Sequence, residues 1–363
     1  MAPIVSRPLL PLAPHLKQAV ASYQRQEPLG FGQVMAPVMV RADYSNGEWS
    51  MPELVAYQGL TLDPACKSLH YGQQVFEGMK AFALETGEGA LFRPQMNLAR
   101  LNDSAARMAM PAVPSELFLQ SLESLVWHLQ PMIPRGPNES LYLRPLMLAT
   151  DVGLSLKPST SYVFLVIASP SGGYFAAGKV TALIERHDCR AAPGGTGAYK
   201  VAGNYGAGIR ADIKATQRGC QQTLWLDAVH KSYIEEFSGM NFFAVVDGEL
   251  CTPSVSDSVL RGVTRDSVIQ LARGRNIPVA EKPLHIDELL AAIKRGLCTE
   301  MFACGTAAVI TPVDALAEID GTTYEVPPSS PSSLSLILRD QLMAMQTGRQ
   351  VAPDGWLHRV GHT

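Results

Sequence analysis

The chain has 363 residues, of which 47% are hydrophobic and 17% charged. This composition is typical of a compact globular protein long enough for about two domains. Its formal net charge of −3 provides no basic field for nucleic acid or for an anionic membrane surface. The apolar stretches are strand-sized, such as 162–168, and are too short to span a bilayer.

The cysteines and the N-terminus indicate the compartment. No two of the six cysteines have the spacing of a zinc or redox motif, so we expect reduced thiols, no metal centre and a cytoplasmic protein. Residues 1–30 contain four prolines before residue 15 and lack the apolar core of a secretory signal. We therefore expect an extended arm, with an organelle transit segment as the alternative.

The first half of the chain mixes strand and helix patterns. Asn46-Gly47 is a hairpin signal, and Asn97 is a candidate helix cap. The expected elements are strand segments around that turn over 38–57, a strand pair over 76–83 and 90–93, helices over 97–108 and 115–129, and strands over 141–149 and 162–168.

The stretch 169–178 is rich in Gly, Ser and Ala and predicts a domain boundary. We expect a small N-terminal α/β domain over 1–168, a linker over 169–179 and a larger mixed α/β domain over 180–363. The elements expected in the second domain are strands over 180–185, 223–227, 240–246 and 298–303, and helices over 204–218, 262–273 and 333–345, the first with Tyr205, Ile209 and Ile213 on its apolar face.

Lys200 is the most informative residue of the second domain. It is one of ten lysines, and it lies in a loop with six glycines between 194 and 208. Small neighbours let bulky ligand atoms approach the amine. A lysine amine that can lose its proton forms Schiff bases with carbonyl compounds or with pyridoxal phosphate. No Gly-Lys-Ser/Thr sequence and no dinucleotide-binding glycine pattern is present, so a P-loop or hydride-transfer enzyme is a poor fit.

Further segments look specialised in the same way. They are Tyr71, the run 76–82 (Phe-Glu-Gly-Met-Lys-Ala-Phe), 142–145 (Tyr-Leu-Arg-Pro), 235–241 (Glu-Glu-Phe-Ser-Gly-Met-Asn), 262–265 (Gly-Val-Thr-Arg) and 304–308 (Cys-Gly-Thr-Ala-Ala). In this order and spacing the chain closely resembles the branched-chain amino acid aminotransferases, which are pyridoxal phosphate enzymes of fold type IV. The resemblance runs from about Tyr44 to the C-terminal helix.

The resemblance implies roles around the cofactor ring. Lys200 would bind the cofactor covalently and then act as the base that moves a proton on the substrate. Glu236 matches the glutamate that keeps the pyridine nitrogen protonated. The alternative is that Glu235 has this role, in which case the assignment is wrong by one residue. If the role belongs to Glu236, we expect Glu235 to be a solvated charge. Tyr205 matches the tyrosine that bonds the phenolic oxygen.

The phosphate needs hydrogen-bond donors. Val263 and Thr264 lie where a helix begins, and free amides at such an end favour an anion. By resemblance, Arg100 would add a charge-assisted contact and Thr306 a hydroxyl. Arg190 is a weaker candidate for the same cluster.

The resemblance also implies a substrate site. The amides around Thr306 and Ala307, in a turn that Gly305 makes possible, would hold the substrate carboxylate. Phe76 and Tyr142 would line the pocket for a branched side chain, with Tyr71 reaching the partner subunit's site and Arg144 lying near the pocket.

The resemblance implies transfer of the amino group of L-leucine, L-isoleucine or L-valine to 2-oxoglutarate, and it implies a homodimer, which we expect to be cytoplasmic. D-amino acid aminotransferases and aminodeoxychorismate lyases, which share fold and cofactor, are the alternative. A non-catalytic relative is disfavoured because Lys200, Tyr205 and Glu236 are all present. Two departures stand out: Ala308 and Thr311 replace a Cys-x-x-Cys found in some relatives, and Gly239 replaces a threonine.

Overall fold

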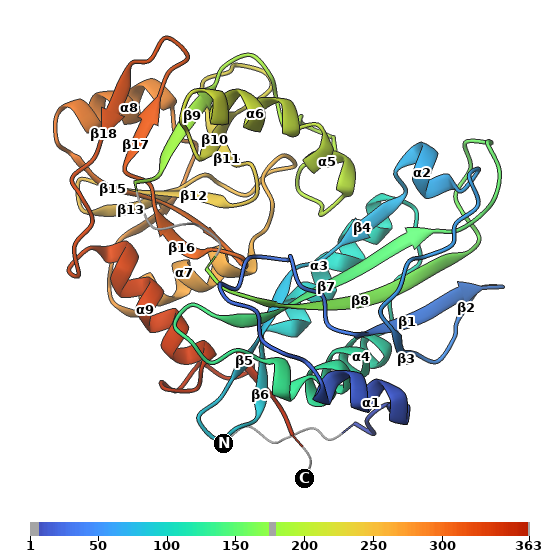
Figure 1. Ribbon diagram of the computed structural model, residues 1–363. Helices are drawn as coiled ribbons and strands as arrows, with labels where there is room; N and C mark the ends of the chain where they lie inside the picture. Colours follow the sequence, from blue (N-terminus) through green and yellow to red (C-terminus); the bar gives the residue numbers. More distant parts are fainter. Residues whose placement is uncertain (1–6, 174–178, 362–363) are drawn as a thin grey trace. The chain divides into compact units, whose positions relative to one another are not determined.

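The computed structural model describes residues 7–173 and 179–361. They form two compact units, one made of 7–173 with 344–361 and the other of 179–343 (Figure 1). We expected all of 180–363 in the second domain, which is wrong for the residues from 344 on. They join the first unit because the last strand, β19, pairs with β6.

The predicted linker over 169–179 begins later in the chain than we expected. Strand β8 continues through Ser171, and the Gly172 amide then donates to the Gly30 carbonyl at 3.3 Å. The residues 169–171 therefore belong to the sheet of the first unit, and 174–178 lie outside the described residues.

The first unit is built on an antiparallel sheet that has nine strands among the described residues, in the order β19-β6-β5-β7-β8-β1-β2, with β3 on β1 and β4 on β7. The strands are β1 (Val38–Ser45), β2 (Glu48–Trp49), β3 (Glu53–Ala56), β4 (Gln74–Phe76), β5 (Met79–Ala83), β6 (Gly89–Phe92), β7 (Ser140–Ala149), β8 (Tyr162–Ser171) and β19 (Leu357–Val360). The two expected hairpins are confirmed: β1 pairs with β2, and β5 with β6.

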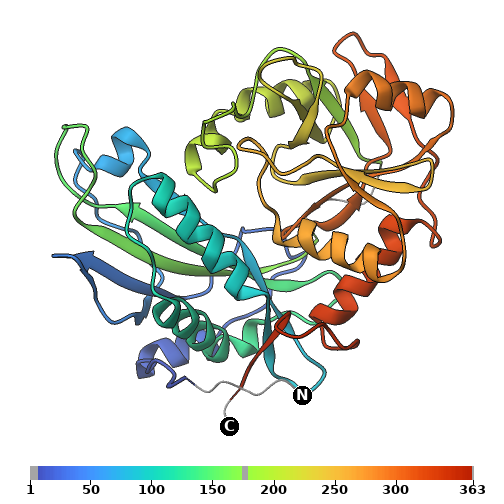
Figure 2. The same cartoon turned by 180° about the vertical axis from the view of Figure 1, so that it is seen from behind.

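The helices of the first unit are α1 (Pro14–Ala21), α2 (Lys67–Tyr71), α3 (Pro94–Arg107) and α4 (Ser115–His128), and α4 leads into a short 3-10 turn (Gln130–Met132). Figure 2 shows α3 and α4 lying across one face of the sheet. Two expectations fail here. The N-terminal arm contains α1, whose Leu16 and Val20 are buried. Asn97 lies inside α3 and is no cap, because the helix begins at Pro94, whose ring suits a first turn.

The second unit has a mixed sheet of ten described strands, in the order β14-β13-β12-β11-β10-β9-β17-β18, with β15 on β12 and β16 on β15. The strands are β9 (Thr181–Glu185), β10 (Gln222–Leu226), β11 (Ile234–Phe237), β12 (Asn241–Val246), β13 (Glu249–Thr252), β14 (Val279–Glu281), β15 (Cys298–Gly305), β16 (Val309–Pro312), β17 (Ala315–Ala317) and β18 (Thr323–Glu325). Phe243 and Phe302 stack across β12 and β15 with ring centroids 5.0 Å apart. The α/β fold class is confirmed.

The helices of the second unit are α5 (Ala202–Gly206), α6 (Ile209–Gln217), α7 (Val263–Gly274) and α8 (Ile286–Lys294), and α9 (Leu334–Gln346) leads back to the first unit. The expected helix over 204–218 is divided at 207–208. Its predicted apolar face is wrong, because Ile209 and Ile213 are exposed while Ala211 and Ala215 are buried.

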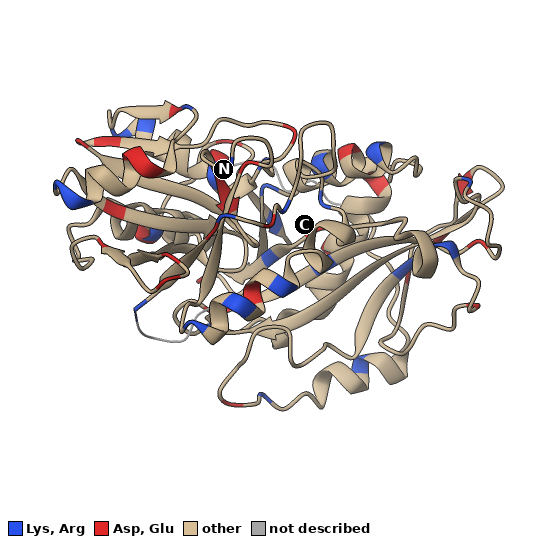
Figure 3. Cartoon of the chain, turned by 90° about the horizontal axis from the view of Figure 1, so that it is seen from above, with Lys and Arg blue, Asp and Glu red and all other residues tan. Residues whose placement is uncertain are grey.

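Positions of Lys and Arg are interspersed with positions of Asp and Glu along the ribbon of both units (Figure 3). Within the ranges that the structure describes, no helix is long and apolar enough to cross a membrane.

Candidate functional site

The lysine loop of the second unit connects β9 to α5. The short helix α5 brings Tyr205 back to Lys200, whose Nζ donates to the Tyr205 hydroxyl at 2.8 Å. The amine also lies 5.0 Å from the centre of that ring. The two residues that we expected to act together are therefore in direct contact.

Asn204 holds this loop in shape, a role that the sequence did not reveal. Its Nδ2 donates to the carbonyls of Thr196 at 2.7 Å and Tyr199 at 2.9 Å. Its Oδ1 accepts from the Thr196 hydroxyl at 2.7 Å. Because Asn204 uses both ends of its amide, it fixes the backbone on the N-terminal side of Lys200.

Glu236 lies on β11 and is buried, with only 4% of its surface exposed. Its Oε1 pairs with the Arg190 guanidinium at 2.8 Å. Its Oε2 accepts from Asn241 Nδ2 at 3.0 Å and from the Leu260 amide at 3.1 Å. Burial raises the pKa of Glu236 to about 7, although the Arg190 charge and the Leu260 amide act to lower it.

Glu235 is not the solvated charge that we expected. It is 6% exposed, and its Oε1 accepts from the Ser258 hydroxyl. Burial raises the pKa of Glu235, although the hydrogen bond from Ser258 acts to lower it. Both faces of β11 are covered, so neither glutamate of the pair reaches solvent.

Asn241 connects Glu236 to the segment that precedes helix α7. Asn241 Nδ2 donates both to Glu236 and, at 2.9 Å, to the Leu260 carbonyl two residues before the helix cap Gly262. A Cβ on Gly262 would come within 2.1 Å of Asn241 Oδ1, so only glycine permits this approach. Val263 and Thr264 are the first residues of α7 and are buried.

The turn between β15 and β16 holds Thr306 and Ala307, both half-buried. Gly305 pairs with Val309 across it, and Cys304 pairs with Asn241 of β12. Gly305 was expected to make the turn possible by its backbone. The left-handed residue is instead Val309, with a φ of 59°, which is uncommon for a β-branched side chain.

A second group of predicted residues lies on the sheet of the first unit. Arg144 Nη2 donates to the Tyr142 hydroxyl at 3.1 Å, and its guanidinium lies 4.9 Å from the centre of the Phe76 ring. A Cβ on Gly78 would lie 2.1 Å from the Tyr142 hydroxyl. Lys80, opposite Tyr142 in the ladder, is buried, and burial lowers its pKa to about 8.

Arg100 of α3 is fixed by Glu77, the residue between Phe76 and Gly78. Its Nε and Nη2 donate to the two Glu77 oxygens at 2.7 and 2.8 Å, and Asn97 Nδ2 donates to Glu77 at 2.8 Å. Glu77 is fully buried. The carboxylate therefore orients Arg100, and this is the role of Asn97 that a capping pattern could not predict.

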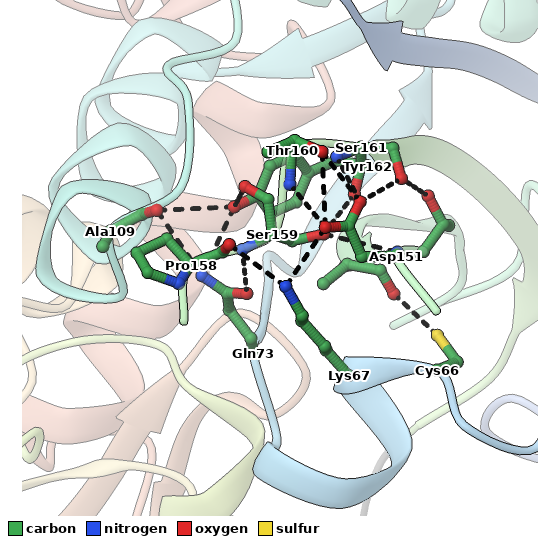
Figure 4. A network of polar contacts seen from close by, with 12 residues as sticks. Cys66, Lys67, Gln73, Ala109, Asp151, Pro158, Ser159, Thr160, Ser161 and Tyr162 are labelled. Atoms are coloured by element: carbon green, nitrogen blue, oxygen red, sulfur yellow. Dashed lines mark hydrogen bonds and ion pairs between the residues drawn. The ribbon is translucent and has the colours of Figure 1, made fainter. Parts of the chain in front are cut away.

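Tyr71 lies at the end of α2 and is 40% exposed. Its hydroxyl donates to the Leu154 carbonyl, in the loop between β7 and β8. Figure 4 shows how Asp151 holds that loop: it accepts from the Thr160 and Ser161 amides and from Lys67 Nζ. Burial acts to raise the pKa of Asp151, but the Ser161 hydroxyl, the amide and hydroxyl of Thr160 and the Lys67 amine lower it below its usual value.

Comparison with known proteins gives consistent matches. A model of the class IV amino-transferases matches residues 74–316. A branched-chain-amino-acid transaminase of Bacillus subtilis is 43% identical over 93% of this chain and 97% of its own length. The branched-chain-amino-acid aminotransferase of Mycolicibacterium smegmatis is 42% identical over 91% of this chain and 92% of its own.

Solved structures are similar too. The branched-chain amino acid aminotransferase of Escherichia coli has a TM-score of 0.71 at 28% identity and covers 89% of this chain and 100% of its own. Another branched-chain amino acid aminotransferase, from T.th., was solved with N-(5'-phosphopyridoxyl)-L-glutamate. It has a TM-score of 0.70 at 26% identity, covering 93% of this chain and 100% of its own.

Proposed function

Because this chain belongs to the class IV aminotransferases, we propose that it transfers the amino group of L-leucine, L-isoleucine or L-valine to 2-oxoglutarate. The products are the branched-chain 2-oxo acids and L-glutamate, formed in a two-step ping-pong reaction. The contact of Lys200 Nζ with the Tyr205 hydroxyl at 2.8 Å, in the same unit as the buried Glu236, is the observation that carries this proposal. The named relatives support the choice of substrate.

The donor set of the second unit fits pyridoxal 5'-phosphate. Among the described residues, the Arg190 guanidinium is the one polar group that pairs with Glu236 Oε1. A carboxylate oxygen can accept two hydrogen bonds. One acceptor position is thus available for the N–H of a protonated pyridine. The start of α7 offers amides for the phosphate. When bound, the cofactor supplies an aldehyde for the amino group and a ring that accepts electrons.

Each candidate residue of the second unit then has a defined role. Lys200 holds the cofactor and afterwards moves the proton of the substrate Cα. Tyr205 positions that amine and the phenolic oxygen. Glu236 keeps the pyridine nitrogen protonated, while Val263, Thr264 and Thr306 bind the phosphate, and the amides near Thr306 and Ala307 bind the substrate carboxylate.

The first unit supplies the remaining candidates. Arg100, oriented by Glu77, is the first unit's candidate for a charged contact with a phosphate group. Phe76 and Tyr142 contact the apolar substrate side chain. Arg144 carries a positive charge beside both rings, which suits the second carboxylate of 2-oxoglutarate and L-glutamate.

The working form is a cytoplasmic homodimer in this proposal. A group of apolar side chains is exposed around Tyr71, comprising Leu69 at 61%, Val152 at 64%, Leu154 at 65% and Leu156 at 82%. Exposed apolar patches commonly mark interfaces, and Tyr71 within this patch would contact the partner. The six cysteines are free thiols, which fits a reducing compartment. Sedimentation of the purified protein at a mass of one chain would refute the dimer.

Half-reaction spectroscopy tests the function. The protein loaded with pyridoxal phosphate is mixed with single amino acids, and conversion of the bound cofactor to pyridoxamine phosphate is followed by absorbance. L-leucine, L-isoleucine and L-valine should convert it, and 2-oxoglutarate should restore it. Conversion by D-alanine but not by L-leucine would overturn the proposal in favour of a D-amino acid aminotransferase.

A further inference from the structure

Arg190 joins three segments of the second unit. It is 7% exposed and lies ten residues before Lys200. Its Nη2 donates to the Ser258 carbonyl and, at 3.2 Å, to the Gly197 carbonyl of the lysine loop. The same nitrogen lies 2.8 Å from Glu236 Oε1. The guanidinium thus fastens β11, the lysine loop and the segment before α7 to one another.

Arg190, a weaker candidate for the phosphate cluster, is paired in this structure with a carboxylate. Arg190 directs its charge at the Glu236 carboxylate. Since the side chains of Arg190 and Glu236 are 4% and 5% exposed, solvent screens their attraction only weakly. The pairing therefore acts on the ionisation of Glu236.

Glu236 needs such a partner. Burial favours the neutral form of a carboxyl group, and the neighbouring Glu235 adds a like charge that also raises the pKa of Glu236. Arg190, the Leu260 amide and Lys200 act in the opposite direction. Of these, only Arg190 is both permanently charged and in contact with the carboxylate.

We propose that Arg190 is a positioning residue that keeps Glu236 ionised and aimed, and so keeps the proton on the pyridine nitrogen of bound pyridoxal phosphate. This inference rests on the proposed function. Without the guanidinium, the buried glutamate retains its proton, or takes it from the pyridine N–H, and becomes neutral. The pyridine ring is then neutral as well and attracts electrons from the substrate Cα less strongly.

The test compares wild type with Arg190→Gln and Arg190→Lys. Glutamine keeps a donor without the charge, and lysine keeps the charge. With ¹⁵N-labelled cofactor bound, the pyridine ¹⁵N chemical shift reports where the proton lies. We expect a protonated nitrogen in wild type, a shift to the neutral value in R190Q, and recovery in R190K. The half-reaction rate with L-leucine should fall in R190Q on the order of 10- to 100-fold, as for loss of a contact with a charged group.

Arg186→Gln is the matched control. Arg186 lies on the same segment but pairs with Glu318 and Asp287 and is 34% exposed, so its loss should leave the ¹⁵N shift unchanged. An unchanged shift in folded R190Q would overturn the inference. Should R190Q fail to fold, the infrared carboxylate band of wild-type apoprotein decides, once it is assigned with Glu236→Gln. A Glu236 that is still neutral at about pH 8.5, above its pKa of about 7, refutes the proposal, and an ionised one supports it. Failure of wild type to bind the cofactor would instead refute the proposed function.

Discussion

Replacing Asp151 by asparagine should destabilise the first unit strongly, although the two side chains have nearly the same shape. Asp151 accepts from Lys67 Nζ at 3.1 Å, from the Thr160 amide at 3.0 Å and from the Ser161 amide at 2.9 Å. The first two donors meet the same oxygen, Oδ2. In asparagine an NH₂ group at that position would face both donors.

The magnitude follows from burial. The Lys67 side chain is 8% exposed and that of Asp151 is 18% exposed. Removing one member of a buried ion pair costs about 3–5 kcal/mol, and the partial exposure of Asp151 favours the lower end. A loss of about 3 kcal/mol lowers the melting temperature of a unit of this size by roughly 6–12 °C. Asp43→Asn is the control, because its pair with Arg41 is about half exposed and should contribute less than about 1 kcal/mol.

The effect should depend on pH with a defined sign. The pKa of Asp151 is lowered in the folded state, so its stabilisation is present above the unfolded pKa, about 3.9, and is lost as the pH falls through the folded value. The difference in melting temperature between wild type and D151N should therefore be full at pH 7 and shrink below about pH 4. Differential scanning calorimetry over this pH range measures it. A difference at pH 7 no larger than that of D43N would refute the reasoning.

Three further predictions concern the second unit. Lys200→Ala should abolish turnover yet leave the melting temperature of the apoprotein within a few degrees, measured by calorimetry, because the loop side chain is only half-buried. Glu236→Gln should slow the L-leucine half-reaction about 10- to 100-fold; a larger effect of Glu235→Gln would mean that the register is wrong by one. Gly262→Ala should weaken cofactor binding in an absorbance titration, since its Cβ would lie 2.1 Å from Asn241 Oδ1, whereas Gly274→Ala, with open space around it, should not.

Locally encoded elements were predictable from the sequence. The Asn46-Gly47 turn formed its hairpin because those residues suit the turn directly. The helix from Ser115 was found within one residue, since its apolar spacing is helical throughout. Lys200 and Tyr205 are close in the sequence, and the short helix α5, which contains Tyr205, brings its hydroxyl to the Lys200 amine.

Long-range polar contacts were not predictable. Asn97 reads as a helix cap, yet it donates to Glu77, twenty positions away. Glu235 looked like a solvated charge because its burial depends on strands and loops distant in the sequence. Ile209 and Ile213 follow helical spacing, but the break before α6 and the packing of the unit leave them exposed. The hydrogen-bonding roles of Asn204, Asn241 and Asp151 become visible only when the backbone groups that they serve are placed.

Reductive trapping tests the central claim most directly. The purified protein is incubated with pyridoxal phosphate, reduced with borohydride, digested and analysed by peptide mass spectrometry. The account predicts one phosphopyridoxyl label, on Lys200. A label on another of the ten lysines, or a protein that takes up no cofactor at all, would contradict it.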